Sequence, residues 1–185
     1  AKYGLDKPVF EQYLTYLKDL LRGDFGPSIK NRGRQVIDLI MEGFAVSAKH
    51  GLVAACLAIV IGLVLGALAA VFHDSWIDKT IMVLSTAFVA IPSFVVATLL
   101  LLIFCITFPI FPANGNVSGG LVLPIISLSL SPMSYITRLT RSSMLDVLGQ
   151  DYIRTARAKG VSNTKVIFKH ALKNAVTPVI TYVGP

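Results

Sequence analysis

The sequence predicts an all-α integral membrane protein. Of its 185 residues, 54% are hydrophobic and only 15% are charged, against roughly 25% charged residues in soluble domains. Two long runs contain no Asp, Glu, Lys, Arg or His: 22 residues from Gly51 to Phe72, and 58 residues from Thr80 to Thr137. Because about 20 apolar residues cross a bilayer as a helix, the first run holds one span and the second holds two.

The first 43 residues are polar and precede the spans. Between Pro8 and Gly23, apolar side chains recur at the spacing of one helical stripe. Pro8 suits the first turn of such a helix, and Gly23 suits its end. We expect an amphipathic helix that packs on the membrane surface or on a neighbouring helix, rather than a dedicated ligand site.

The first span covers about 47–72 and is rich in small residues. Gly62 and Gly66 form a GxxxG pattern, at which the backbone of another helix can approach closely. This pattern indicates a packed helix and does not specify its neighbour. Cys56 and Cys105 lie in predicted spans, where they serve as small apolar residues.

The second and third spans cover about 80–108 and 121–137, separated by a loop rich in Pro, Gly and Asn. Pro92 lies in the middle of the second span, where its ring frees a backbone carbonyl and bends the helix. The chain starts without methionine and stops inside an apolar run, so we expect residues 175–185 to begin a further span of a longer protein.

The basic residues indicate the orientation of the chain. Residues 1–43 hold seven Lys and Arg against six Asp and Glu, and residues 138–174 hold eight against two. The Lys and Arg counts nearly tie, but the N-terminal segment is neutralised by its acidic residues and several of its cations lie far from the first span. We therefore expect 1–43 to be extracytoplasmic, 44–137 to form three transmembrane helices, and 138–174 to form a cytoplasmic loop.

Several functional classes lack support in the sequence. Nothing ionisable lies between Thr80 and Thr137, whereas proton-coupled and ion-coupled carriers depend on ionisable residues at mid-membrane. The hydroxyl groups of this region could line a neutral, wet path or could bond to carbonyls of their own helices. The patterns GxxxxGK[ST], HExxH, GxSxG and CxxC do not occur, and the three scattered histidines predict no metal site. We expect no catalytic residues, no metal and no nucleic-acid partner.

The segment YIRTARAKG, residues 152–160, combines cations with one glycine. On a helical projection, one small apolar face holds Tyr152, Ile153, Ala156 and Gly160, and the opposite face holds the arginines, with Thr155 and Lys159 at the border. Gly160 suits the left-handed position that ends a helix, and Ser162 suits the start of the next helix. On composition alone, this cluster could simply set the topology and contact anionic lipid.

This loop resembles the cytoplasmic loop of binding-protein-dependent ABC importer permeases. Their motif reads Glu-Ala-Ala, three residues, Gly, nine residues, then Ile-x-Leu-Pro; Gly160, Ala156 and Leu172 stand at matching positions. Among the positions that depart from it, Arg154 stands in place of Glu, His170 in place of Ile and Lys173 in place of Pro. These departures are characteristic of the oligopeptide, dipeptide and nickel branch.

Other stretches resemble the same branch, among them YLKDLLRGDFGPS, IPSFVVA and ALKNAVTPVITYVGP, so the resemblance covers nearly all of the chain. It is strongest to the B-type permease subunit of oligopeptide importers. The resemblance implies a type I ABC importer permease fold, here a fragment with three complete spans and the start of a fourth, without an N-terminal helix and the last spans.

The resemblance also implies a function. The chain would be a transport subunit, not an enzyme, that moves oligopeptides across the bacterial cytoplasmic (inner) membrane as a multi-pass protein. The loop 150–173 would couple it to ATPase subunits through Arg154, Thr155, Ala156, Arg157, Ala158, Lys159 and Gly160. Pro92 would mark a helix bend in a moving wall.

The implied partners are a second homologous permease subunit, two cytoplasmic ATPase subunits, an extracytoplasmic peptide-binding protein and membrane lipid. No cofactor is expected in this chain, and ATP and Mg are expected on the partner subunits. Within the same class, a dipeptide, glutathione or nickel importer permease is an alternative. From a different class, a non-transporting membrane anchor with a basic recruitment loop is another.

Overall fold

The computed structural model describes residues 6–115 and 117–184, and helices are the main regular elements of this part of the chain. Its strand-like pairing is limited, among the described residues, to one isolated bridge between Pro27 and Gln35. The all-α class predicted from the sequence is confirmed. The chain divides into two compact units, residues 1–49 and 50–185, which are described separately.

The first unit contains an amphipathic helix, α1 (Val9–Leu21). It begins directly after Pro8, and Gly23 follows its end in a left-handed conformation with φ of 79°, as the sequence predicts. No residue of α1 is buried, and the side chain of Phe10 is 70% exposed. The helix itself is therefore confirmed, whereas the surface that covers its apolar stripe stays a prediction.

Two helices of the described residues are long and apolar enough to cross a membrane, α2 (Val36–Val71) and α5 (Val122–Leu148). Both are longer than the uncharged runs that predict them: α2 starts before Ser47, and α5 continues past Thr137. The sequence analysis located the apolar parts correctly and missed the polar ends, because helical hydrogen bonds do not stop where hydropathy falls.

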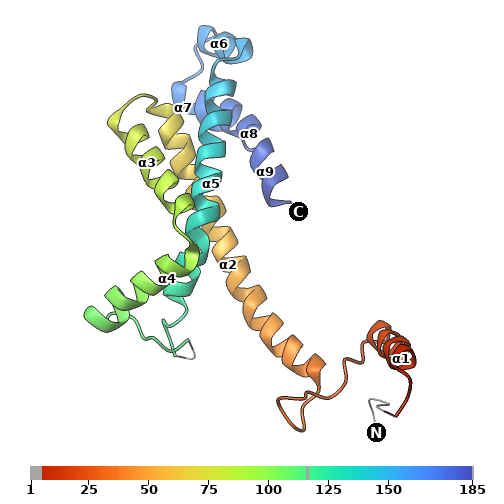
Figure 1. Cartoon of the computed structure of the whole chain (residues 1–185). Helices are drawn as coiled ribbons and strands as arrows, with labels where there is room; N and C mark the ends of the chain where they lie inside the picture. The colour runs from red at the N-terminus through yellow and green to blue at the C-terminus, as the bar shows by residue number, and fades with distance from the viewer. Residues whose placement is uncertain (1–5, 116, 185) are drawn as a thin grey trace. The chain divides into compact units, whose positions relative to one another are not determined.

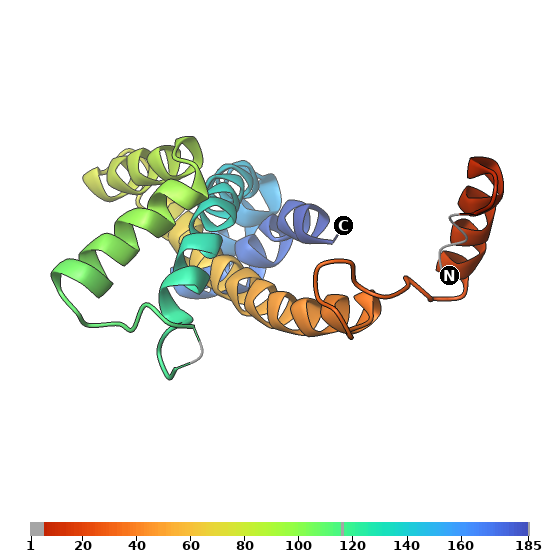
Figure 2. The same ribbon diagram turned by 60° about the horizontal axis from the view of Figure 1, so that its bottom comes forward.

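A third crossing results if a bent pair of helices is taken as one span. This pair consists of α3 (Trp76–Ala90), then α4 (Ser93–Leu101), which continues as the π-helix η1 (Leu102–Thr107). The angle between its two arms is 100°, and both Figure 1 and Figure 2 show α4 turning away from the direction of α3. The expected second span is therefore two helices rather than one gently bent helix.

The break between α3 and α4 lies at Pro92, the residue for which the sequence predicts a bend. Pro92 has no N–H to continue the hydrogen-bonding of α3, and its ring disfavours a helical conformation at the preceding residue. Ile91 is accordingly extended, with φ of −86° and ψ of 124°. Helix α4 then starts at Ser93, directly after the proline.

Replacing Pro92 with alanine should straighten this segment, because alanine restores the N–H donor and removes the restriction on Ile91. Spin labels on the exposed residues Val83 and Leu99 should move apart when α3 and α4 become more nearly collinear. The labels need a background without Cys56 and Cys105, which are both free thiols. An unchanged label distance would show that packing, not the proline, sets the angle.

In the second unit, α2 crosses α5 at very short range. The buried residues of α2 recur at every fourth position, as Ala54, Ala58, Gly62, Gly66 and Ala70. A Cβ atom built on Gly66 would lie 2.5 Å from the carbonyl oxygen of Thr137 on α5. The two backbones therefore touch at the GxxxG pattern, which confirms the prediction of a packed helix and identifies its neighbour.

Several hydroxyl groups in the apolar helices bond to their own helix. Thr86, Thr98, Thr107, Ser127 and Ser129 each donate to a carbonyl three to five residues earlier, at 2.8–3.0 Å. Of the two alternatives that the sequence leaves open for these five side chains, the internal hydrogen bond is the one that forms.

After α5 the chain reverses direction through short helices beside the end of the bundle. These are α6 (Asp151–Ala158), α7 (Asn163–Lys165), the π-helix η2 (Val166–Ala171), α8 (Leu172–Ala175) and α9 (Thr177–Val183). Figure 1 shows α6 beyond the end of α5 and the later helices returning beside it. One buried cluster joins them to the bundle: Ala70, Met144, Ile153, Val166, Ala171 and Ala175.

Candidate functional site

Helix α6 ends in a Schellman motif centred on Gly160. Gly160 has φ of 75°, in the left-handed region. Its N–H donates to the carbonyl of Arg157 at 3.0 Å, and the N–H of Val161 donates to the carbonyl of Ala156 at 3.2 Å. This pair of bonds satisfies carbonyls that the helix end leaves free. The left-handed glycine predicted from the sequence is confirmed, and it reverses the chain toward α7.

Ser162 stands at the start of α7, as predicted, but its side chain makes no capping hydrogen bond. The return limb is instead held by packing. Its buried residues are Val166, Ala171, Ala175 and Val179, so the first interval is five residues and the later ones are four. The π-helical turn η2 produces this wider interval, and it allows both ends of the turn to face the core.

The apolar face of α6 is directed into the chain. Ile153 is fully buried against Met144 and Val166, and Ala156 packs against the same cluster. A second tie is the hydrogen bond of 2.8 Å from Asn174 Nδ2 on α8 to the hydroxyl of Tyr152 on α6. The sequence analysis placed Ala156 on the small apolar face and named it as a coupling residue. It is half-buried against its own chain, and its role in coupling stays a prediction.

The opposite face of α6 is exposed and basic. Its solvent-exposed residues are Arg154, Thr155, Arg157, Ala158, Lys159 and Gly160. Arg154 lies 3.6 Å from Asp151 with both side chains largely exposed, a kind of pair that contributes little stability. Arg157 and Lys159 make no ion pair with any described residue. Six of the seven residues named as coupling residues are thus exposed to solvent, and Ala156 is partly buried.

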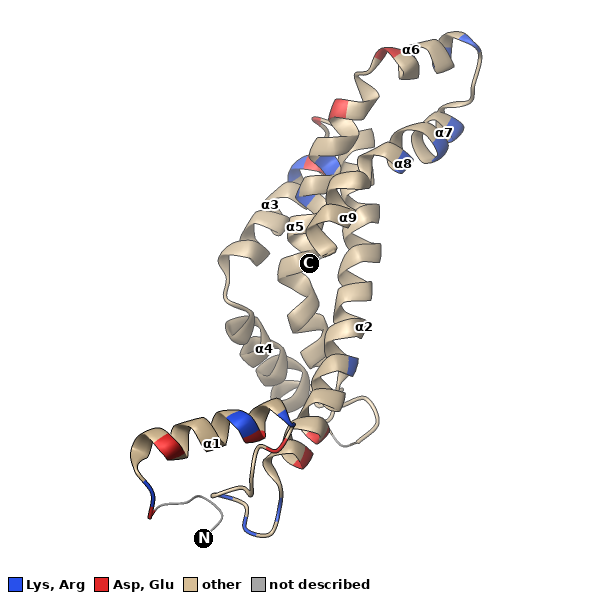
Figure 3. Cartoon of the chain, turned by 90° about the vertical axis from the view of Figure 1, so that its right-hand side faces the viewer, with Lys and Arg blue, Asp and Glu red and all other residues tan. Residues whose placement is uncertain are grey.

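The exposed basic residues lie on a helix that is packed against the bundle through Ile153. Two of its cations, Arg157 and Lys159, have no ion-pair partner among the described residues. Figure 3 shows basic residues at α6 and α7, near the C-terminal end of α5. Exposed guanidinium groups on a rigid helix suit carboxylates of a protein partner, since arginine binds carboxylates with a planar fork. The geometry fits a docking surface for an acidic cleft.

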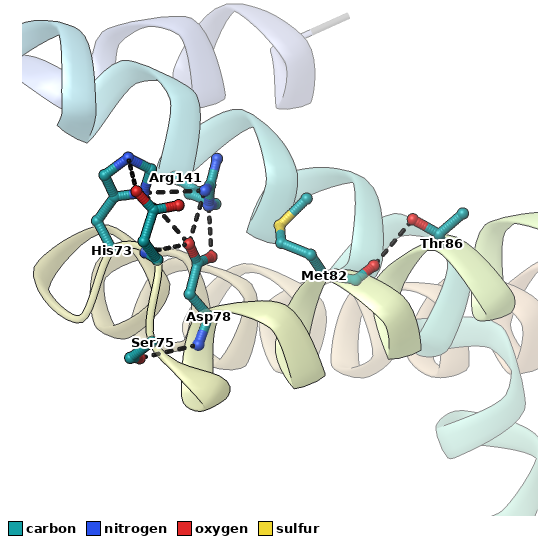
Figure 4. Close-up of polar contacts among 7 residues, drawn as sticks. His73, Ser75, Asp78, Met82, Thr86 and Arg141 are labelled. Atoms are coloured by element: carbon teal, nitrogen blue, oxygen red, sulfur yellow. Dashed lines mark hydrogen bonds and ion pairs between the residues drawn. The ribbon is translucent and has the colours of Figure 1, made fainter.

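A second polar cluster lies where the α2–α3 turn meets α5, and sequence reasoning missed it. Arg141 of α5 contacts both carboxylate oxygens of Asp78, from Nε to Oδ1 at 2.6 Å and from Nη2 to Oδ2 at 2.7 Å (Figure 4). The Asp78 side chain is only 3% exposed. Removing one partner of such a buried ion pair typically costs about 3–5 kcal/mol, because the other charge stays buried and unpaired.

The turn that carries Asp78 is itself held in place. The N–H of Asp74, whose φ is 60°, donates to Asp78 Oδ2 at 3.0 Å. The Ser75 hydroxyl accepts from the N–H of Asp78 at 3.4 Å, as an N-cap of α3. His73 Nδ1 lies 3.1 Å from Arg141 Nη2 and 3.3 Å from Asp78 Oδ2. It accepts from the arginine when unprotonated and donates to the carboxylate when protonated. The carboxylate therefore has a fixed position and a fixed partner.

His73, Asp74 and Asp78 together have the side chains of a metal site, with one ligand atom each within 4.8 Å of the others. The guanidinium of Arg141 already occupies both oxygens of Asp78, so this cluster is an ion-pair network with its cation supplied by the protein. The sequence signal that could have found it is modest: oppositely charged residues, among them Asp78 and Arg141, stand just outside consecutive spans, at the same predicted side of the membrane.

Comparison with known proteins agrees with the features described. Residues 62–185 match the family described as "Binding-protein-dependent transport system inner membrane component". The chain is 47% identical over 188 residues to the oligopeptide transport system permease protein OppB of Salmonella typhimurium, covering all of this chain and 61% of that protein. It is 48% identical over 185 residues to the dipeptide transport system permease protein DppB of Bacillus subtilis, covering all of this chain and 60% of that protein.

A third relative, the dipeptide transport system permease protein DppB of Lactococcus lactis, is 38% identical over 184 residues, which cover 99% of this chain and 61% of that protein. The chain thus spans about 60% of the length of these relatives. The family match includes the α2–α3 turn, α5 and the whole basic loop. The apolar helices and this match together show that the chain belongs to the family of binding-protein-dependent transport system inner membrane components, multi-pass proteins of the cytoplasmic membrane.

Proposed function

We propose that this chain is part of the transmembrane permease subunit of an ATP-driven importer that moves oligopeptides across the cytoplasmic membrane. Relatives that are 47% and 48% identical to this chain are named for oligopeptide and dipeptide transport, which supports a peptide as the substrate. The observation that carries the coupling role is the exposed basic face of α6 on a buried, rigid support.

In this proposal, residues 138–174 lie in the cytoplasm and residues 1–43 lie outside. The α2–α3 turn lies at the same end of the second unit as Arg141, so the chain between them makes an even number of crossings. With α2 added, the number of crossings between residues 1–43 and 138–174 is odd, as the proposed orientation requires. The residues Arg154 to Gly160 dock into a cleft on a cytoplasmic ATPase subunit, where Arg157 and Lys159 face carboxylates. Binding and hydrolysis of ATP with Mg on two such subunits move the loop.

The remaining partners follow from the same proposal. A second homologous permease subunit completes the path, and an extracytoplasmic peptide-binding protein delivers the substrate to the outer loops. The uncharged run 80–137 suits substrates with varied side chains and a common backbone, because a wide neutral path selects weakly among them.

Reversal of one charge tests the coupling surface. The variant Arg157→Glu should lose peptide-stimulated ATP hydrolysis by about tenfold or more in the full assembly reconstituted with its binding protein, because like charges across a contact cost several kcal/mol. Lys169→Glu is the matched control: it reverses an exposed cation on the return limb and should stay close to wild type. Equal losses in both variants would indicate a general charge requirement instead.

The same assembly distinguishes the rival functions. A dipeptide importer is the second candidate, favoured by the 48% identity to a dipeptide permease, and it would respond to dipeptides but not to longer peptides. A glutathione or nickel importer would respond only to its own ligand. A membrane anchor would show no stimulation of ATP hydrolysis by any of these ligands, which would overturn the proposal.

A further inference from the structure

Helix α5 carries two contacts to different parts of the second unit within a single helical turn. Arg141 holds Asp78 at the start of α3. Met144 is fully buried and packs with Ile153 of α6 and with Val166 of η2. Residues three apart in a helix differ by about 4.5 Å along its axis, so a short rigid stretch of α5 joins the α3 contact to the α6 contact.

The two contacts differ in what they fix. The Met144 contact is apolar and tolerates small changes of angle, because such packing has no preferred direction. The Asp78–Arg141 contact is a two-point fork, which fixes distance and orientation together. The carboxylate is also held from its own side by the Asp74 N–H at 3.0 Å. The start of α3 is therefore tied to α5 in one orientation.

Beyond this tie, α3 leads directly to the break at Pro92 and to α4. A displacement of α6 reaches α5 through the buried cluster. It reaches α3 through the packing of α3 on α5 and, at the start of α3, through the ion pair. Without the pair, only undirected packing would hold the start of α3 to α5.

On the basis of the proposed function, we propose that Asp78 and Arg141 are positioning residues that make α3 follow α5 and α6 when the ATPase moves the loop. Neither residue contacts substrate in this proposal. Their role is to make α3 move together with α5 and α6, so that ATP hydrolysis is accompanied by peptide transport.

The test uses the complete assembly in nanodiscs and the double variant Asp78→Asn/Arg141→Gln, which removes both charges together, so that neither stays buried without its partner. Spin labels on Val83 of α3 and Ser142 of α5, both exposed, report the distance between the helices with and without ATP. In the otherwise unchanged chain, this distance should be the same in both states. In the double variant, it should differ between them.

A second readout is peptide uptake per ATP hydrolysed, measured in proteoliposomes. Coupling between sites commonly corresponds to about 5–150-fold, so uptake per ATP should fall at least about fivefold in the double variant. Lys79→Gln and Arg138→Gln are the controls, since they remove exposed charges from the same two helices and should leave the ratio unchanged. A purely structural role would lower the Tm and leave the ratio as it was.

The variant Arg141→Lys covers the case in which the double variant does not assemble. Lysine keeps the charge and loses the fork, so the ratio should fall to a value between wild type and the uncoupled limit. A constant label distance in the double variant, or a normal ratio in Arg141→Lys, overturns the inference. If the unmodified assembly imports no peptide, the proposed function fails, whereas the label distances still test the pair because they require only nucleotide.

Discussion

Replacing Gly160 with valine should lower ATP-dependent peptide uptake roughly tenfold or more, while the subunit stays in the membrane. A left-handed conformation costs an ordinary residue about 1–2 kcal/mol, and 1.4 kcal/mol corresponds to a factor of about ten. A β-branched residue at φ of 75° lies at the unfavourable end of this range. The loss comes from the backbone, because a Cβ on Gly160 meets no atom of its own chain within 4 Å.

Two further variants separate conformation from contact with a partner. Gly160→Asn tolerates the left-handed conformation and still adds a side chain at an open surface. If backbone conformation is the requirement, this variant should remain near wild type; if a partner needs the empty space, it should be as inactive as valine. Gly149→Ala is the control, since Gly149 has φ of −79° and its added Cβ would make only ordinary contacts, the nearest at 3.5 Å.

Substitution of Ala156 should act by a different physical cause, because Ala156 packs against the buried cluster whereas Gly160 is open. Replacing Ala156 with tryptophan should also abolish uptake, because the larger side chain would push α6 away from the cluster around Met144 and Val166. The effect would pass through the position of the helix, not through direct contact with an ATPase. The variant should therefore lower the Tm of the assembly, which Gly160→Asn should not do.

Gly66→Leu should prevent a stable assembly from forming. An added Cβ at Gly66 would lie 2.5 Å from the carbonyl oxygen of Thr137 and 2.5 Å from Cβ of Thr140. Neither is the flexible end of a side chain, so α2 and α5 would have to separate. Overpacking of a core usually costs about 1–3 kcal/mol, and contact with a backbone atom leaves fewer ways to relax.

The other glycines of α2 give this prediction a graded control. A Cβ added at Gly62 would lie 2.8 Å from the Ile136 side chain and 2.9 Å from the carbonyl oxygen of Met133, whereas a Cβ added at Gly51 would meet nothing within 4 Å. The Tm of the purified assembly should therefore fall most for Gly66, less for Gly62 and little for Gly51. The reverse order would mean that α2 and α5 do not cross at the GxxxG pattern.

Hydropathy predicted the elements that depend on composition. The uncharged runs locate α2, the α3–α4 pair and α5, because a bilayer selects for apolar residues over a known length. Local backbone chemistry was also readable: Gly160 reverses the chain as predicted, and Pro92 stands at the break. These features depend on a residue and its immediate neighbours, which a sequence displays directly.

Structural features that depend on contacts between distant segments could not be predicted from the sequence. Asp78 and Arg141 are 63 residues apart, and each alone looks like an exposed charge near the end of a span. The inward position of Ala156 depends on where Met144 and Val166 lie, and the 100° angle at Pro92 depends on packing as well as on the proline. A single sequence has no signal for the register between two helices.

The contact at Gly66 also limits how the second unit can move. The carbonyl of Thr137 sits in the notch left by the missing side chain, so sliding α2 along its axis would move this carbonyl out of the notch. Rotation of α5 about this point would keep the close approach. We therefore expect a push on α6 at one end of α5 to tilt α5 about the glycine crossing rather than to slide it along α2.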